Sequence, residues 1–223
     1  QQHGSPSVRV DGPPYQATLT SARVQMAAVM NVKTFDTPTG RVGYMQFNTH
    51  SEPAEAQLVN AVTDLKTAGV TDLVLDLRYN GGGLLGVANE LASMIAAPPT
   101  TSGKVSARLQ FNRKNPFGLS AEEAGQKFMT QTVGYSLAPG LPLPQLNLSR
   151  VTVLSGPDTC SASESIVNAL RGVDVPVDLV GSPTCGKPYG FLPEDNCGTT
   201  YFAIQFKGVN ATGGGNYDDG FAP

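Results

Sequence analysis

Apolar residues recur along this chain with two periods, one typical of strands and one typical of helices, and the two alternate. Short apolar or alternating runs predict strands over residues 42–47, 72–78, 105–111, 151–154, 177–180 and 199–206. Helical spacing and cap residues predict helices over residues 53–68, 84–97 and 161–171, with a shorter one over 120–129. Because strands and helices alternate, we expect an α/β fold with parallel central strands and right-handed crossovers.

The N-terminal part and the middle of the chain carry weaker patterns. The first residues are mostly Gly, Pro, Ser and polar, which is typical of a tail, and two β-leaning pieces, 17–20 and 29–32, follow them. We therefore divide the chain into a lead-in over residues 1–40 and a main domain over residues 41–223. Residues 100–149 are expected to form an insertion over the core that shapes a substrate cleft.

Composition narrows the classes of protein to which this chain can belong. It has 223 residues, of which 40% are hydrophobic and 15% charged, and its net charge is −3. No run of Lys or Arg occurs, which argues against a surface for nucleic acid or for an anionic membrane. No apolar stretch is long enough to cross a membrane. A globular domain with a sizeable core is the expected result.

The three cysteines allow a disulfide but not a zinc site. The chain has no CxxC spacing and only two histidines, so we expect no metal centre. Cys185 and Cys197 flank a loop rich in Gly and Pro, and they either pair or remain thiols. If the protein is exported, we predict that these two form a disulfide and that Cys160 stays unpaired.

One stretch, residues 159–164, reads as a tight turn between a strand and a helix. Its small residues let the backbone approach another group closely, and Ser161 stands at the helix start, where free N–H groups point outward. A hydroxyl there can attack a carbonyl while nearby amides hold the oxyanion. The alternative is structural, because Ser161 with Glu164 three residues later also forms a capping box.

The glycine turn after the strand 72–78 has three interpretations. Gly81, Gly83 and Gly86 fit the GxGxxG pattern of dinucleotide sites, but the acidic residue expected about 20 positions later is missing. Glycines also let N–H groups approach a carbonyl oxygen without a Cβ in the way, so the turn can serve as an oxyanion loop. The third interpretation is a tight turn packed under a helix.

Lys187 is the third candidate for chemistry. It follows Ser161 across one helix and one strand, which in a parallel α/β layout returns the chain to the same edge of the sheet. An amine takes a proton from serine only when it is neutral, and burial without a carboxylate partner favours the neutral form. The alternative for a single lysine is an ordinary solvated surface charge.

Together these segments resemble the C-terminal processing, or tail-specific, peptidases of serine peptidase family S41. LDLRYNGGG at 75–83 is similar to that family's LDLRxNxGG segment, and SASE at 161–164 to its nucleophile motif. GSPTCGK at 181–187 is similar to its GxxTxGK lysine motif. The three motifs occur in the family's order, and the resemblance extends over residues 42–206.

The resemblance implies a Ser/Lys dyad, with Ser161 as nucleophile and Lys187 as general base. It implies an oxyanion hole formed by the N–H of Ala162 and a glycine N–H, from Gly82 or Gly83. It also implies a ClpP/crotonase-like spiral of β-β-α units, polypeptide substrates, no cofactor, and a periplasmic, cell-envelope or secreted location. Family members usually carry a PDZ domain before this core, and an upstream part of that kind is expected here.

The resemblance has one departure, and it leaves two alternatives open. The family often has a glutamine four residues after the lysine, and this chain has Phe191 there. The first alternative is a catalytically idle peptide- or ligand-binding module on the same fold. The second is a crotonase-like acyl-CoA enzyme, although that chemistry usually needs a carboxylate beside the glycine loop.

Overall fold

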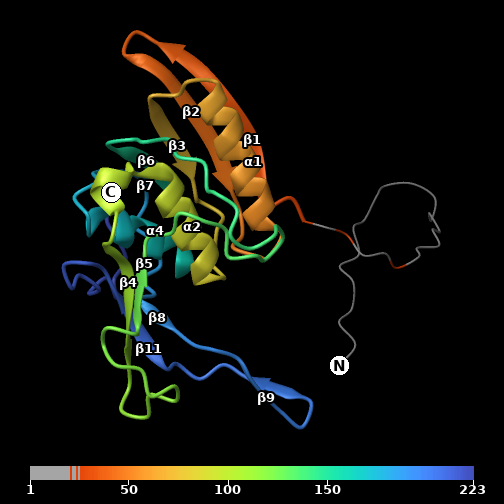
Figure 1. Cartoon of the computed structure of the whole chain (residues 1–223), viewed down its shortest axis with the longest axis vertical. Coiled ribbons are helices and arrows are strands. Elements are labelled where there is room, and N and C mark those ends of the chain that lie inside the picture. Colours follow the sequence, from red (N-terminus) through yellow and green to blue (C-terminus); the bar gives the residue numbers. More distant parts are fainter. Residues whose placement is uncertain (1–20, 22–23, 25) are drawn as a thin grey trace, which may run out of the picture.

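The computed structural model describes residues 21, 24 and 26–223, and Figure 1 shows their arrangement. The predicted tail and the β-leaning piece 17–20 lie outside these residues. The second β-leaning piece is part of the strand β1 (Val29–Thr37), which pairs with the next strand of the chain.

A five-stranded sheet forms the centre of the fold. Its strands are β1, β2 (Gly40–Phe47), β3 (Asp72–Asp76), β6 (Val151–Ser155) and β7 (Val177–Gly181), adjacent in that order. β2, β3, β6 and β7 are parallel, as the alternation of strands and helices predicts, and β1 adds an antiparallel edge. The chain is therefore a mixed α/β protein, and the loops at the carboxyl ends of its parallel strands meet at one edge of the sheet.

Helices join the parallel strands and bury their apolar faces in one core. They are α1 (Ala54–Thr67), α2 (Leu85–Ile95), the short α3 (Pro98–Thr101) and α4 (Ala162–Arg171). In α1, Leu58, Val62 and Leu65 follow a helical spacing and are at most 1% exposed. No helix in the described part of the chain is long and apolar enough to cross a membrane.

A second sheet lies below the first in Figure 1. It contains β5 (Gly125–Lys127), β4 (Val105–Phe111), β11 (Phe206–Val209) and β8 (Tyr189–Gly190), adjacent in that order and antiparallel. β9 (Glu194–Asn196) and β10 (Thr199–Tyr201) form a separate hairpin that projects from the body (Figure 1).

Two expected elements are wrong in this second region. Residues 120–129 do not form a helix, because the chain turns at Ser120 and the following backbone pairs with β4 as the strand β5. Residues 199–206 do not form one strand, because β10 pairs with β9 while β11 pairs with β4 and β8. In both segments distant partners decide where the backbone hydrogen bonds go.

Candidate active site

Ser161 occupies the turn between β6 and α4, as the sequence predicts. Its backbone has φ 58° and ψ −113°, a sparsely populated conformation for a residue with a side chain. The turn is fixed to the neighbouring strand end by Thr159, whose hydroxyl donates to the Leu77 carbonyl at 2.8 Å. The surrounding structure thus holds a strained serine at the start of a helix.

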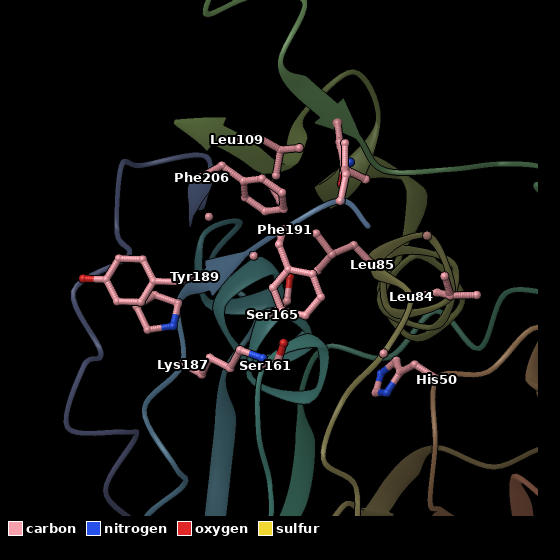
Figure 2. A pocket seen from close by; sticks show the side chains of 18 of the residues that line it. His50, Leu84, Leu85, Leu109, Ser161, Ser165, Lys187, Tyr189, Phe191 and Phe206 are labelled. Carbon is pink, nitrogen blue, oxygen red and sulfur yellow. The ribbon is translucent and has the colours of Figure 1, made fainter. Parts of the chain in front are cut away.

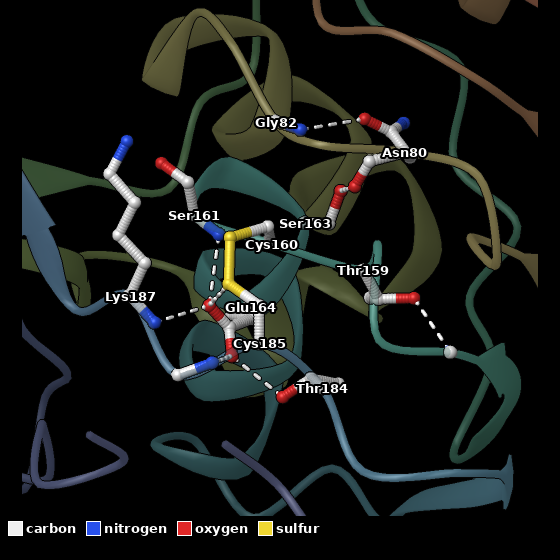
Figure 3. The surroundings of a disulfide bond; sticks show 12 residues. Asn80, Gly82, Thr159, Cys160, Ser161, Ser163, Glu164, Thr184, Cys185 and Lys187 are labelled. Atoms are coloured by element: carbon white, nitrogen blue, oxygen red, sulfur yellow. Dashed lines mark hydrogen bonds between the residues drawn. A yellow bond between two sulfur atoms is a disulfide. The ribbon is translucent and has the colours of Figure 1, made fainter. Parts of the chain in front are cut away.

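Glu164 connects the turn of Ser161 to the loop of Lys187. Its carboxylate is completely buried, and its Oε2 accepts the backbone N–H groups of Ser161 at 2.9 Å and Lys187 at 2.8 Å. Its Oε1 accepts the N–H of Gly186 and the hydroxyl of Thr184 (Figure 3). The carboxylate is therefore paired with four donors from two segments that are distant in sequence.

The amine of Lys187 lies beside the hydroxyl of Ser161. Figures 2 and 3 show the amine and the hydroxyl side by side, and both residues line one cavity. The amine also lies 5.1 Å from the ring centre of Phe191, within the range of a cation–π contact. Among the described residues Lys187 forms no ion pair, and no hydrogen bond joins its Nζ to Ser161 Oγ.

The predicted pairing of Cys185 with Cys197 is wrong. The disulfide joins Cys185 to Cys160, with 5.2 Å between the Cα atoms, and Cys197 is a free, exposed thiol. The physical reason is the hairpin β9–β10, which carries Cys197 away from the body, while Thr159 and Glu164 hold the other two segments together. The bond thus connects the residue before the candidate nucleophile to the candidate lysine's loop (Figure 3).

A cluster of possible metal ligands coincides with this disulfide. Ligand atoms of Cys160, Glu164 and Cys185 lie within 4.8 Å of one another. Sulfur atoms joined in a disulfide are not thiolates, and the carboxylate already has four donors, so the cluster in this form does not suit a metal ion.

Gly82 contacts the nucleophile turn, but its N–H group already has a partner. A Cβ at Gly82 would lie 2.9 Å from the Ala162 nitrogen and from the Ser161 Cβ, so only glycine fits there. Its N–H donates to Asn80 Oδ1 at 3.0 Å. The prediction that Gly82 donates to the oxyanion therefore does not fit this arrangement, because its N–H group is already bonded to Asn80. Gly82 instead allows the glycine turn to pack closely against Ser161 and Ala162.

Gly83 and Ala162 are the remaining predicted donors. Gly83 is bridged to His50, since the His50 N–H donates to the Gly82 carbonyl and the Leu84 N–H to the His50 carbonyl. In such a parallel bridge the N–H of Gly83 itself points away from His50. Ala162 is the first residue of α4, where a backbone N–H has no partner within the helix.

His50 and Asn80 form a buried polar pair under the glycine turn. Asn80 Nδ2 donates to the Phe47 carbonyl, so Asn80 Oδ1 is left as an acceptor. His50 Nδ1 lies 3.0 Å from this oxygen and therefore carries the proton of the hydrogen bond. Burial lowers the pKa of His50 to about 4. The neutral ring thus presents Nε2 as an acceptor, and this buried atom has no partner among the described residues.

The cavity above these groups has a volume of about 520 Å³ and lies between the two sheets. Its floor comes from the glycine turn and the start of α4, and its roof from the second sheet and the loop after Lys187 (Figure 2). Apolar side chains dominate the lining, including Leu84, Leu85, Leu109, Phe191, Phe202 and Phe206. Such a cavity suits an apolar side chain of a ligand held near Ser161.

Sequence reasoning missed part of this site. It gave Glu164 only a capping role and did not select Asn80 or His50. Asn80 and Glu164 both lie inside the motifs at 75–83 and 161–164, so their signal was present. His50 follows β2, whose carboxyl end reaches the same edge of the sheet as the other site residues.

Comparisons with known sequences agree with the resemblance at these motifs. A model of peptidase family S41 matches residues 41–192. The chain is 32% identical over 147 residues to a carboxyl-terminal-processing protease of Picosynechococcus sp., covering 66% of this chain and 29% of that protein. It is 28% identical over 131 residues to a chloroplastic C-terminal processing peptidase of Tetradesmus obliquus, covering 59% of this chain and 23% of that protein.

Solved structures give the same result for the fold. A protein of Bacteroides fragilis assigned to the S41 proteases superposes with a TM-score of 0.73 and 28% identity, over 88% of this chain and 49% of that one. A photosystem II D1 C-terminal processing protease superposes with a TM-score of 0.62 and 20% identity, over 90% and 48%. The chain thus spans less than a third of these curated relatives and about half of each solved structure.

Proposed function

Because the chain belongs to peptidase family S41, we propose that it is the core of a serine endopeptidase that cleaves polypeptides near their C-termini. The observation that carries this proposal is the placement of Ser161 and Lys187 side by side in one apolar cavity (Figure 2). The names of the two curated relatives support cleavage near the C-terminus.

In the proposed mechanism Ser161 and Lys187 act as a dyad. The neutral amine of Lys187 takes the hydroxyl proton as Ser161 Oγ attacks the peptide carbonyl. The resulting ammonium returns the proton to the leaving amine, and an acyl-enzyme forms. Lys187 then removes a proton from the water that hydrolyses this ester. The absence of an ion pair at Lys187 among the described residues supports the role of a base.

The N–H groups of Ala162 and Gly83 are proposed to hold the oxyanion. Both belong to the edge of the sheet where Ser161 lies, and preorganised donors of this kind stabilise the charge that develops in the transition state. The hydrogen bond from Gly82 to Asn80 keeps the glycine turn in place for this purpose.

Two further features belong to the same proposal. The parallel strands β2, β3, β6 and β7, with α1, α2 and α4 between them in the chain and the further strands β4 and β5 after α2, support the ClpP/crotonase-like spiral of β-β-α units. The disulfide supports an oxidising location such as the periplasm, the cell envelope or the outside of the cell.

A binding module is the second candidate, and Phe191 is the observation that favours it. The resemblance implies a glutamine at this position, whereas the Phe191 ring lies over the Lys187 amine and supplies no hydrogen bond to orient it. In that case the cavity binds a peptide without cleaving it.

Labelling with a fluorophosphonate and hydrolysis of an unfolded polypeptide separate these two candidates. The peptidase should be labelled at Ser161, and Ser161→Ala or Lys187→Ala should each lower turnover at least about a thousandfold, since nucleophile and base act as one unit. Ser165→Ala is the matched control, because Ser165 lines the same cavity one helical turn later. A wild type that binds the polypeptide but is neither labelled nor active supports the binding module.

A further inference from the structure

The disulfide Cys160–Cys185 joins the two segments that carry the proposed dyad. Cys160 directly precedes Ser161, and Cys185 lies two residues before Lys187. A covalent bond at this place limits how far the nucleophile turn and the lysine loop can separate. Because proton transfer requires the two side chains within hydrogen-bond reach, such a limit bears directly on turnover.

The same two segments share a single carboxylate oxygen. Glu164 Oε2 accepts the N–H groups of both Ser161 and Lys187, and the Cys185 Sγ lies 3.6 Å from this oxygen. In the disulfide this sulfur has no proton and cannot donate. After reduction it becomes a thiol that can donate to Glu164 Oε2, in competition with the two backbone N–H groups that fix the dyad.

One of the two bonded cysteines is exposed to solvent. Cys185 is exposed, whereas Glu164 beneath it is buried. Thiol–disulfide exchange requires access of a thiolate to one sulfur atom, and exposed disulfides are the ones that reductants cleave most readily. The bond therefore combines access for a reductant with contact to the backbone of both proposed catalytic residues.

We propose that the Cys160–Cys185 disulfide is a redox-controlled positioning element, and that the peptidase turns over efficiently only when this bond is formed. This inference rests on the function proposed above and adds its regulation. Reduction by a dithiol breaks the S–S bond, and two electrons and two protons pass from the dithiol to the two cysteine sulfurs. Cys160 and Cys185 become thiols and the reductant becomes a disulfide, so the step balances.

The test compares turnover of the oxidised and reduced protein on one unfolded polypeptide substrate. Reduction with dithiothreitol should lower kcat by about 10- to 100-fold, as expected for a small misplacement of catalytic groups, and should leave KM within about twofold. Reoxidation should restore kcat. The double variant Cys160→Ser with Cys185→Ser should show the low kcat with and without dithiothreitol.

Cys197→Ser is the matched control, because Cys197 is the free thiol at the hairpin tip. This variant should respond to reduction like the wild type. Circular dichroism should show that the reduced protein is folded, and hydrogen exchange should become faster at the amides of Gly186 and Lys187. A structural bond without a positioning role would not combine retained folding with a selective loss of kcat.

Each other outcome overturns the proposal in a distinguishable way. A folded, reduced protein with both thiols alkylated and an unchanged kcat would show that the disulfide does not position the dyad. Unfolding of the whole protein on reduction would assign the bond to stability alone. An oxidised wild type without hydrolysis or fluorophosphonate labelling would overturn the proposed function itself, and this regulation with it.

Discussion

At the scale of single residues, the strain at Ser161 and the buried carboxylate of Glu164 belong to one arrangement. The positive φ of Ser161 carries a conformational cost of about 1–3 kcal/mol. The charge-assisted hydrogen bond from the Ser161 N–H to Glu164 offsets part of this cost. A capping role and a catalytic role for this turn are therefore compatible, because the Glu164 contact that caps the helix also fixes the nucleophile.

Replacing Glu164 by Gln should lower both stability and turnover. The amide keeps the size but turns an NH₂ group toward N–H donors, so at least one buried donor loses its partner at a cost of about 1–3 kcal/mol. Because Glu164 Oε2 serves both Ser161 and Lys187, kcat should fall more than KM rises. Urea denaturation and steady-state kinetics measure the two effects.

The exposed Glu123 provides the control for this substitution. Its carboxylate accepts hydrogen bonds from Ser120 on the surface, so Glu123→Gln should stay within about 0.5 kcal/mol of the wild type. Equal stability and equal kcat in Glu164→Gln and Glu123→Gln would contradict the role assigned to Glu164.

At the scale of elements, the sequence predicts the parallel sheet well and the second sheet poorly. Three of the five residues in β3 and in β6 are apolar, and these short runs, like the helical spacing in α1 and α4, are local information. β5 and β10 have three residues each, and their existence depends on partners far away in the chain. Such short strands have no periodicity of their own, so the helix that the sequence predicts over residues 120–129 is wrong.

Two buried glutamates attach the loop 132–140 to the helices. Glu55 of α1 accepts the N–H groups of Gly134, Ser136 and Leu137, and Glu90 of α2 accepts that of Val133. Burial, together with the neighbouring Glu55, raises the pKa of Glu90 to about 7. Burial also opposes ionisation of Glu55, but its three N–H donors outweigh that effect and keep its pKa below the usual range.

Replacing Glu90 by Gln should remove a loss of stability at high pH. The folded protein keeps a proton on Glu90 up to about pH 7, whereas the unfolded chain releases it near 4.5. The stability from this group is therefore present below about pH 4.5 and is lost as the pH rises through about 7. Glu90→Gln stays neutral, so at pH 8 it should exceed the wild type by roughly 1–3 kcal/mol in the free energy of unfolding.

The titration of His50 should change the free energy of unfolding with pH in the direction opposite to that of Glu90. Burial lowers its pKa from 6.5 to about 4, so the unfolded chain binds the extra proton first and stability rises from pH 4 to 6.5. Urea denaturation of Glu90→Gln should show this rise in stability. In the wild type, the stability lost through ionisation of Glu90 partly cancels it. The exposed Glu122→Gln is the control, and a variant profile identical to the wild type would refute the assignment to Glu90.

At the scale of the whole molecule, the site forms where the two sheets face each other. The sequence predicts Ser161 and Lys187 because each lies in a motif of the family. It could not predict the disulfide partner, because Cys197 is nearer to Cys185 in sequence while Cys160 is near in space. It could not predict the cavity roof either, because residues from β4, β8, β11 and the chain on either side of the hairpin meet there only after folding.

The last prediction concerns Phe202, which extends the cavity roof beyond the proposed dyad. Its ring packs edge-on against Phe191 with 5.3 Å between the centres, and 59% of the residue is exposed. An apolar surface next to a peptidase site can hold an apolar substrate side chain. Phe202→Ser should therefore raise KM for an apolar peptide about three- to tenfold, equivalent to roughly 1 kcal/mol of lost contact, and leave kcat almost unchanged.

Tyr201→Ser is the matched control for this prediction. Tyr201 is the preceding residue and is 55% exposed, but it does not line the cavity. Steady-state kinetics should give a wild-type KM for Tyr201→Ser, and a peptide that is polar around the cleaved bond should show no difference among the three proteins. An equal rise of KM in both variants would mean that the exposed segment at the end of β10, rather than the cavity face of Phe202, determines substrate binding.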